Sequence, residues 1–155
     1  MNKLLFVFAS ALALSALSGC RPFAPATPPG FVDLSDSYSN DEYRSTTADG
    51  MVLGVRAFKN KPKGELPFWT KVVENRMRDT SGYALLETKD VKDRSGNVGK
   101  QLRFGHDESA VPHLYYVTIF VNDDHVYVLE AGGTKDLVTK HEPQIAWSIE
   151  NFLQK

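Results

Sequence analysis

Apolar side chains occupy every second position from residue 51 to residue 57, and this period of two predicts a β-strand. The apolar face of that strand contains Met51, Leu53, Val55 and Ala57. The dipeptide Asp49-Gly50 just before it is a strong signal for a tight hairpin turn. We therefore expect residues 43–59 to form a β-hairpin, and the short run 31–34 to add a strand in front of it.

The hydrophobic period changes after residue 64. Apolar side chains then recur every three or four positions, as on the buried face of a helix, at Leu66, Trp69, Val73 and Met77. Pro67 lies in the first turn, where proline is tolerated, and Gly82 is a typical residue at a helix end. These features predict an amphipathic helix from Glu65 to about Thr80.

Further β-prone runs follow this helix, separated by turn-forming residues. They span residues 83–91, 98–106, 114–121 and 126–131. The run 114–121 is apolar on both of its faces, which is typical of a central strand that is covered from both sides. Short turns between the runs favour hairpin connections and therefore an antiparallel sheet.

The last part of the chain returns to a helical pattern. Thr134 is suited to cap a first turn, and Pro143 divides the segment into a short piece and a main helix from Pro143 to Leu153. The predicted buried stripe of this helix contains Ile145, Ile149, Phe152 and Leu153. The predicted order is β-β-α-β-β-β-β-α, an α+β class with a mainly antiparallel sheet and packed helices.

Three features of this pattern carry a resemblance to a known fold. They are the element order with its closing helix, the stretch GYALLE after the first helix, and the paired long strands in HLYYVTIFVNDDHVYVLEAGG. Together they resemble the Mog1/PsbP-like fold, a group that includes the DcrB-like bacterial lipoproteins. The resemblance covers residues 31–155. It implies a sandwich of that type in a non-enzymatic protein that binds partner proteins or supports larger complexes, and it identifies no site residue.

The first residues predict a secretory signal. Lys3 supplies a short basic region, and the apolar run from Leu4 to Leu17 is shorter than the roughly 20 residues that span a bilayer. The run ends in Leu17, Ser18, Gly19 and Cys20, which resembles the lipobox of bacterial lipoproteins. That resemblance implies that residues 1–19 are a lipoprotein signal peptide, that the chain is cleaved before Cys20, and that Cys20 carries the lipid.

The residues after the cysteine suggest how the protein is placed. By the same resemblance, Arg21 favours sorting to the outer membrane, with the protein facing the periplasm. Residues 20–30 are proline-rich, so we interpret them as the lipidated cysteine followed by a stiff, extended tether. The alternative is an N-terminal arm that packs on the domain. Residues 31–155 are then a single α+β domain.

Charge and composition narrow the function classes. The chain has 18 basic and 19 acidic residues and a formal net charge of -1, so it lacks the basic excess that is typical of nucleic-acid-binding proteins. Its one cysteine leaves no internal disulfide, and no G-x-S-x-G motif is present. We predict that the protein is not an enzyme and has no cofactor apart from the lipid on Cys20.

The best candidate for metal chemistry is RFGHDESAVPH. Its possible ligands are His106, Asp107, Glu108 and His113, because imidazole and carboxylate groups bind zinc. The two histidines would approach each other across the turn between adjacent strands. The spacing matches neither H-E-x-x-H nor a Cys/His finger, and a solvated polar hairpin loop is the favoured interpretation. His125 and His141 are interpreted as isolated surface residues, and Glu87 and Glu130 as strand-surface glutamates that could face each other.

Aromatic and basic side chains are the candidates for partner contacts. They are Trp147 on the last helix, Tyr115 and Tyr127 on strands, and Arg103 on a strand. A second packing layer, or a sheet-face charge for Arg103, explains the same residues. The favoured function is a lipid-anchored, non-catalytic binding or assembly module for a periplasmic, membrane or secretion-system protein. The alternatives are a metal-binding protein or metal-dependent enzyme, and an immunity-type lipoprotein against a periplasmic toxin.

Overall fold

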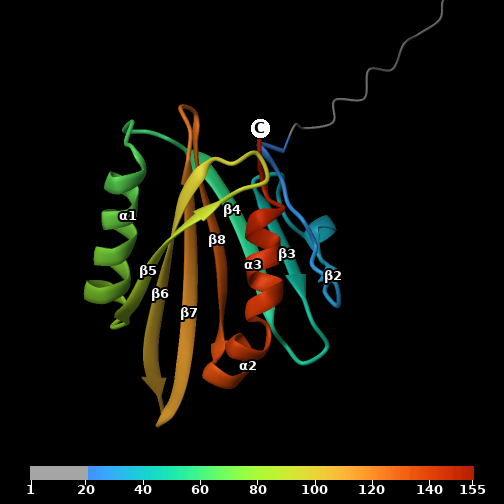
Figure 1. Cartoon of the computed structure of the whole chain (residues 1–155), viewed down its shortest axis with the longest axis vertical. Helices are drawn as coiled ribbons and strands as arrows, with labels where there is room; N and C mark the ends of the chain where they lie inside the picture. Colours follow the sequence, from blue (N-terminus) through green and yellow to red (C-terminus); the bar gives the residue numbers. More distant parts are fainter. Residues whose placement is uncertain (1–20) are drawn as a thin grey trace, which may run out of the picture.

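The computed structural model describes residues 21–155, so the predicted signal peptide and Cys20 lie outside the described residues. Figure 1 shows a sheet with α1 on one side and α3 on the other. The strands are β1 (Phe23–Ala24), β2 (Val32–Asp33), β3 (Glu42–Thr46), β4 (Val52–Lys59), β5 (Ala84–Lys92), β6 (Val98–Glu108), β7 (Val111–Val121), β8 (His125–Thr134) and β9 (Leu153–Gln154). The helical elements are η1 (Ser35–Ser37), α1 (Leu66–Asn75), η2 (Arg76–Thr80), α2 (Lys135–Lys140) and α3 (Glu142–Glu150).

The main sheet has seven strands in the order β2-β3-β4-β8-β7-β6-β5, and all neighbours are antiparallel. The predicted α+β class with an antiparallel sheet is confirmed. The run 114–121, predicted as a central strand, lies in β7 between β6 and β8. Residues 43–59 form the predicted hairpin of β3 and β4, in which Tyr43 pairs with Val55.

The two faces of the sheet bury separate clusters, because successive side chains of a strand point to opposite faces. On the face that α3 covers, the predicted apolar side of β4 packs with α3 in one cluster, which we call the α3 face. Its main members are Leu53, Val55, Tyr116, Phe120, Tyr127, Leu129, Ile145, Ile149 and Phe152. The α1 face is built from Leu102, Phe104, Val117, Ile119, Val126 and Val128.

Helix α1 confirms the amphipathic pattern read from the sequence. Leu66, Trp69, Val73 and Met77 pack on the cluster of the α1 face. The helix continues as one π-helical turn, η2, and Gly82 follows with a φ of +70°, a conformation that favours glycine. No helix within residues 21–155 combines the length and the apolar run needed to cross a membrane.

The closing helix ends earlier than predicted. Helix α3 stops at Glu150 instead of Leu153, and Asn151 closes it because its side-chain amide donates to Trp147 O at 2.9 Å. The chain then turns, which buries Phe152 completely, and Leu153 enters strand β9. The helical period alone did not reveal this end, because β9 has a strand partner from the other end of the chain.

That partner overturns the tether prediction for the described residues. Residues 21–30 pack against the domain, as the alternative interpretation proposed. Strand β1 pairs with β9, and Phe23 is 0% exposed with its ring centroid 5.8 Å from that of Phe152. Thr27 Oγ1 lies 2.7 Å from the Tyr43 hydroxyl. Burial of the Phe23 ring offsets the entropy of ordering the arm, and proline is compatible with so short an edge strand.

Candidate functional site

The four residues predicted as metal ligands share one hairpin. His106 is the direct cross-strand partner of His113, as predicted, but the strands extend to Glu108 and Val111 and leave a turn of only two residues. The His106 ring packs against Tyr83 at 5.1 Å, and His113 Nε2 lies 3.9 Å from Glu108 Oε2. Residues 21–155 bring no three His, Cys, Asp or Glu side chains into an arrangement that could hold a metal ion. The hairpin therefore does not form the predicted ligand set.

Two of the predicted partner-contact residues are engaged inside the fold. Tyr127 is 0% exposed, contrary to the surface role predicted for it, because its ring fills the core beside Phe152. Its hydroxyl lies 3.2 Å from Pro22 O, and burial raises the pKa of the phenol. Arg103 stacks over the Tyr116 ring at 4.4 Å and pairs with Glu142 of α3 at 2.6 Å. Its guanidinium thereby ties the sheet to α3.

The other two residues are reachable from solvent to different degrees. Trp147 is 37% exposed on the outer side of α3, which agrees with its predicted partial exposure. Tyr115 is partly buried on the α1 face, and its ring lies directly over Gly132. A Cβ at Gly132 would stand 2.3 Å from Tyr115 Cδ2, so glycine is required for this ring position. Their roles as partner contacts stay predictions.

A large recess lies between α1 and β4, and we call it the α1 groove. Its volume is about 700 Å³, within the usual range of binding pockets. It exists because α1 packs over β6, β7 and β8 and leaves β4 uncovered on this face. Its lining includes Arg56, Phe58, Trp69, Val72, Val73, Arg76, Met77, Val117, Val128 and Glu130.

The apolar wall of the α1 groove contains large apolar side chains that remain exposed. Phe58 is 41% exposed and Val72 is 40% exposed. The indole of Trp69 meets Phe58 edge-on at 5.5 Å between ring centroids. Clustered exposed apolar side chains are typical of a surface that binds another molecule. The sequence signal for this wall was present in the stripe of α1, but its meeting with Phe58 depends on tertiary packing.

The polar edge of the α1 groove is an ion pair with a third partner. Arg56 donates from Nε and Nη2 to the two carboxylate oxygens of Glu130, at 3.0 and 2.8 Å. The Tyr115 hydroxyl donates to Glu130 Oε1 at 2.9 Å. Burial and then the Glu130 charge raise the pKa of Tyr115. Because all three groups satisfy one another, this edge is a preorganised polar feature beside the apolar wall.

This cluster differs from the carboxylate pair considered from the sequence. Glu130 lies on β8, whereas Glu87 lies on β5 at the far edge of the sheet, so the two do not face each other. Glu87 Oε2 instead approaches Lys89 at 3.4 Å and Arg103 at 3.6 Å. Cross-strand pairing of Gly54 with Glu130 brings Arg56 of β4 to Glu130, a register that no local sequence signal contains.

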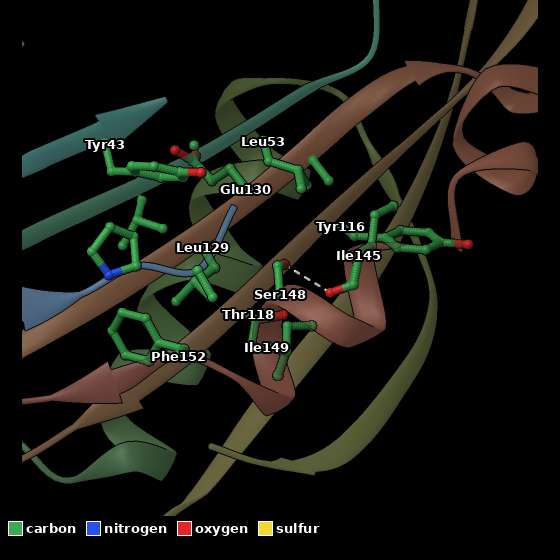
Figure 2. A pocket seen from close by; sticks show the side chains of 15 residues that line it. Tyr43, Leu53, Tyr116, Thr118, Leu129, Glu130, Ile145, Ser148, Ile149 and Phe152 are labelled. Carbon is green, nitrogen blue, oxygen red and sulfur yellow. Dashed lines mark hydrogen bonds between the residues drawn. The ribbon is translucent and has the colours of Figure 1, made fainter. Parts of the chain in front are cut away.

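A second recess, on the α3 face, is a packing void (Figure 2). It is lined by Pro25 and Ala26 of the arm. Tyr43, Leu53, Leu129 and the α3 side chains Ile145 and Ile149 also line it. Its volume is about 20 Å³, enough for about one water molecule. Ser148, which also lines it, donates its hydroxyl to Ile145 O at 2.9 Å. The centre of the α3 face is therefore closed. A recess of about 360 Å³ beside Arg103 and Glu142, between β5 and α3, is smaller than the α1 groove, which is the better candidate site.

Comparison with known proteins identifies the fold. No protein-family model matches the chain, and no curated protein matches its sequence. The solution structure of cyanobacterial PsbP (CyanoP) from Synechocystis sp. PCC 6803 is similar, with a TM-score of 0.53, 14% identity, and coverage of 93% of this chain and 99% of that one. The Ran-binding protein Mog1p of Saccharomyces cerevisiae gives a TM-score of 0.53 and 12% identity, with 83% of each chain covered.

A crystal structure from Bacteroides thetaiotaomicron is also similar, with a TM-score of 0.50 and 10% identity. The match covers 86% of this chain but only 45% of the Bacteroides protein, so the chain spans less than half of that protein's length. At these identities the matches establish the fold alone, which is Mog1/PsbP-like, as the resemblance implied. They transfer no site residue, since a fold by itself does not define a function.

Proposed function

We propose that this protein is a lipid-anchored component of the bacterial envelope that binds another envelope protein in the α1 groove and performs no catalysis. The observation that carries the binding role is the exposed apolar wall of Phe58 and Val72 beside a groove of about 700 Å³. One protein with the same fold, Mog1p, is described as Ran-binding, which is an example of this fold binding a protein.

The groove supports a protein segment as its occupant. Phe58, Trp69 and Val72 offer apolar and aromatic surface, the residue types that are enriched at binding hot spots. Arg76 and the Arg56–Glu130 pair lie at the same groove and supply polar groups that can fix the orientation of a bound segment. The expected ligand is therefore a segment with one or two large apolar side chains flanked by polar residues.

Site-specific photo-crosslinking in cells tests this binding site. A photoreactive amino acid at Val72 should give one discrete crosslinked species, whereas the same residue at Val98 should give none. Val98 is a matched control because it is also an exposed valine, at 53% exposure, but it begins β6 and does not line the groove. Equal crosslinking at the two positions, or none at Val72, would count against the α1 groove. Mass spectrometry of the product identifies the partner.

The identity of that partner also separates the binding module from an immunity-type protein. A structural envelope protein supports an assembly role. A secreted toxin crosslinked at the same position supports the immunity role, in which the groove covers part of the toxin.

The lipid anchor is supported by the lipobox-like residues Leu17 to Cys20, and outer-membrane sorting by Arg21. The variant Cys20→Ala should move the protein from the membrane fraction to the soluble fraction, or leave the signal peptide uncleaved. A serine-to-alanine change at Ser10, within the apolar run, is the control and should leave fractionation unchanged. Membrane association of Cys20→Ala equal to wild type, together with a signal peptide cleaved as in wild type, would sink the anchoring role.

A further inference from the structure

The first described residues are fixed to one end of the sheet. Lys155 N donates to Pro22 O at 3.0 Å, and the Tyr127 hydroxyl lies 3.2 Å from the same oxygen. Arg21 donates from Nη2 to Glu42 O at 3.1 Å, and its guanidinium lies 5.6 Å from the Phe23 ring centroid. Figure 1 shows the start of the coloured chain beside the C label, at the same end as the turn between β7 and β8.

We propose that this end of the domain docks directly on the anionic phospholipid headgroups of the membrane. The inference rests on the proposed lipid anchor at Cys20 and deepens it. We call the surface the anchor end and define it by Arg21, Lys59, Lys61, His125 and Lys155.

The first argument is the length of chain between lipid and domain. Consecutive Cα atoms are about 3.8 Å apart, so a lipid on Cys20 begins one residue away from the fixed Arg21. A free tether of residues 21–30 would have held the domain about 30 Å from the surface at about 3.1 Å per residue. Because these residues are instead packed on the fold, the bilayer surface lies close to the anchor end.

The second argument is charge. A cleft of about 390 Å³ at the anchor end is lined by Arg21, Lys59, His125 and Lys155, and Asp41 is its only acidic side chain. In the adjoining loop Lys61 is exposed, and Lys63 is paired with Asp123 at 2.7 Å. Asp124 is the remaining acidic residue of the neighbouring turn. This local basic excess contrasts with the net charge of -1 for the chain, and it complements phosphate groups.

Docking at this end would fix the direction in which the rest of the domain faces. The β6–β7 hairpin with His106 and His113 lies at the opposite end of the sheet in Figure 1, and α1 extends along the side of the sheet. The α1 groove would then open parallel to the membrane plane. A partner in the same membrane could reach it there.

Chemical coupling tests docking without the cellular lipidation pathway. Protein from residue 20 onward is joined through its only thiol, Cys20, to a maleimide lipid in vesicles of phosphatidylcholine alone or with 30% phosphatidylglycerol. A membrane-impermeant acylating reagent then labels lysines, and mass spectrometry gives the rate at each site. On the anionic vesicles we expect Lys61 and Lys155 to react at least about fivefold more slowly than on neutral vesicles. Lys135 on α2 should be unchanged.

Charge-reversal variants with equal net charge sharpen the test. Lys59→Glu with Lys61→Glu should remove the difference in the labelling rate of Lys155 between the two vesicle types. Arg76→Glu with Lys135→Glu should keep it, since both of these residues lie outside the anchor end. If Lys61 and Lys155 react at the same rate on both vesicle types, or if Lys135 is the site that slows on anionic vesicles, docking at the anchor end is overturned. Membrane-bound Cys20→Ala with a normally cleaved signal peptide in cells would refute the natural anchor while leaving the vesicle result intact.

Discussion

The two faces of the sheet are covered to different extents. The centre of the α3 face is covered by α2, α3, β9 and the N-terminal arm, and the void beneath them is about 20 Å³. A recess of about 360 Å³ remains only at its edge, between β5 and α3. The α1 face has one helix over β6 to β8 and a groove of about 700 Å³ beside it. Of the five fully buried aromatic side chains in residues 21–155, the closed face holds four, Phe23, Phe120, Tyr127 and Phe152. The comparison indicates that one face stabilises the domain, while the other keeps surface free for binding.

The two faces also differ in how their helices are attached. The closed face relies on aromatic packing among Phe23, Phe120, Tyr127 and Phe152. On the open face, the buried amide of Asn60 attaches the start of α1 to the sheet. Its Oδ1 accepts from Trp69 Nε1 at 2.8 Å and from Gly64 N at 2.9 Å, and its Nδ2 donates to Asn122 O at 3.0 Å. These hydrogen bonds of Asn60, which we call the polar anchor of α1, hold the helix on the sheet although apolar side chains do not cover this face completely.

The largest expected effect is in the closed face. Phe152→Ala removes a ring with no exposed surface and should lower the free energy of unfolding by about 3–5 kcal/mol, because a cavity forms where β1, β9 and α3 meet. Urea unfolding followed by circular dichroism measures this loss. Phe68→Ala is the control, since Phe68 is 49% exposed, and it should cost less than about 1 kcal/mol. Similar losses of unfolding free energy in the two variants would contradict the conclusion that the α3 face provides more of the stability than the α1 face.

The second effect concerns the polar anchor of α1. Asn60→Ala leaves the Trp69 N–H and the Gly64 N–H without their acceptor in a site that is only 4% exposed at Asn60. We expect a loss of about 2–3 kcal/mol, since unpaired buried polar groups cost about 1–3 kcal/mol each and partial rehydration recovers some of it. Urea unfolding monitored by tryptophan fluorescence is the measurement. Asn75→Ala, at an exposed position of α1, is the control. A loss below about 0.5 kcal/mol would show that apolar packing alone holds α1.

The smallest effect concerns an ion cluster at the far end of the closed face. His141 is buried, contrary to its interpretation as an isolated surface residue, and its Nε2 lies 3.0 Å from Asp49 Oδ2. Lys140 donates to the same oxygen at 2.7 Å. The hydrogen bond from Lys140, followed by those from Thr47 and His141, holds the pKa of Asp49 well below its usual range.

Because the pKa of Asp49 is lower in the folded state than in the unfolded chain, the ionised carboxylate stabilises the fold at neutral pH. That contribution is present above the unfolded-state pKa of about 4 and is lost as the pH falls towards the folded-state value. Asp49→Asn should therefore unfold at a slightly lower temperature than wild type at pH 7. The difference should shrink steadily below pH 4. A difference that does not change between pH 7 and pH 2.5 would contradict this role, and Asp107→Asn should show no comparable trend.

Local pattern was sufficient for most of the elements. The alternation at residues 51–57, the helical stripe ending at Met77 and the turn at Asp49-Gly50 each depend on neighbours in sequence, and each prediction is confirmed. Predictions that depended on distant partners were less successful. The tether, the end of α3 and the surface role of Tyr127 were wrong, because β1 and β9 meet across almost the whole chain.

The candidate site shows the same division. The sequence contained the stripe of α1, the exposed strand face with Arg56 and Phe58, and Tyr115 as a candidate contact, but not their arrangement around one groove. It also placed His106 opposite His113 correctly, because a hairpin is local. It could not show that these histidines lack the further ligands a metal site needs within residues 21–155, because that depends on side-chain directions across strands.

The sequence by itself determined the α+β class, the positions of the long elements and the antiparallel pairing, since hydrophobic period and turn residues act over a few positions. Only the tertiary structure decided which face of the sheet is closed and which is open. It also decided that the N-terminal arm is fixed at the end where the lipid is proposed to attach. The physical reason is that both depend on the register of strands far apart in the chain, such as Phe23 with Gln154 and Gly54 with Glu130, which no short stretch of sequence encodes.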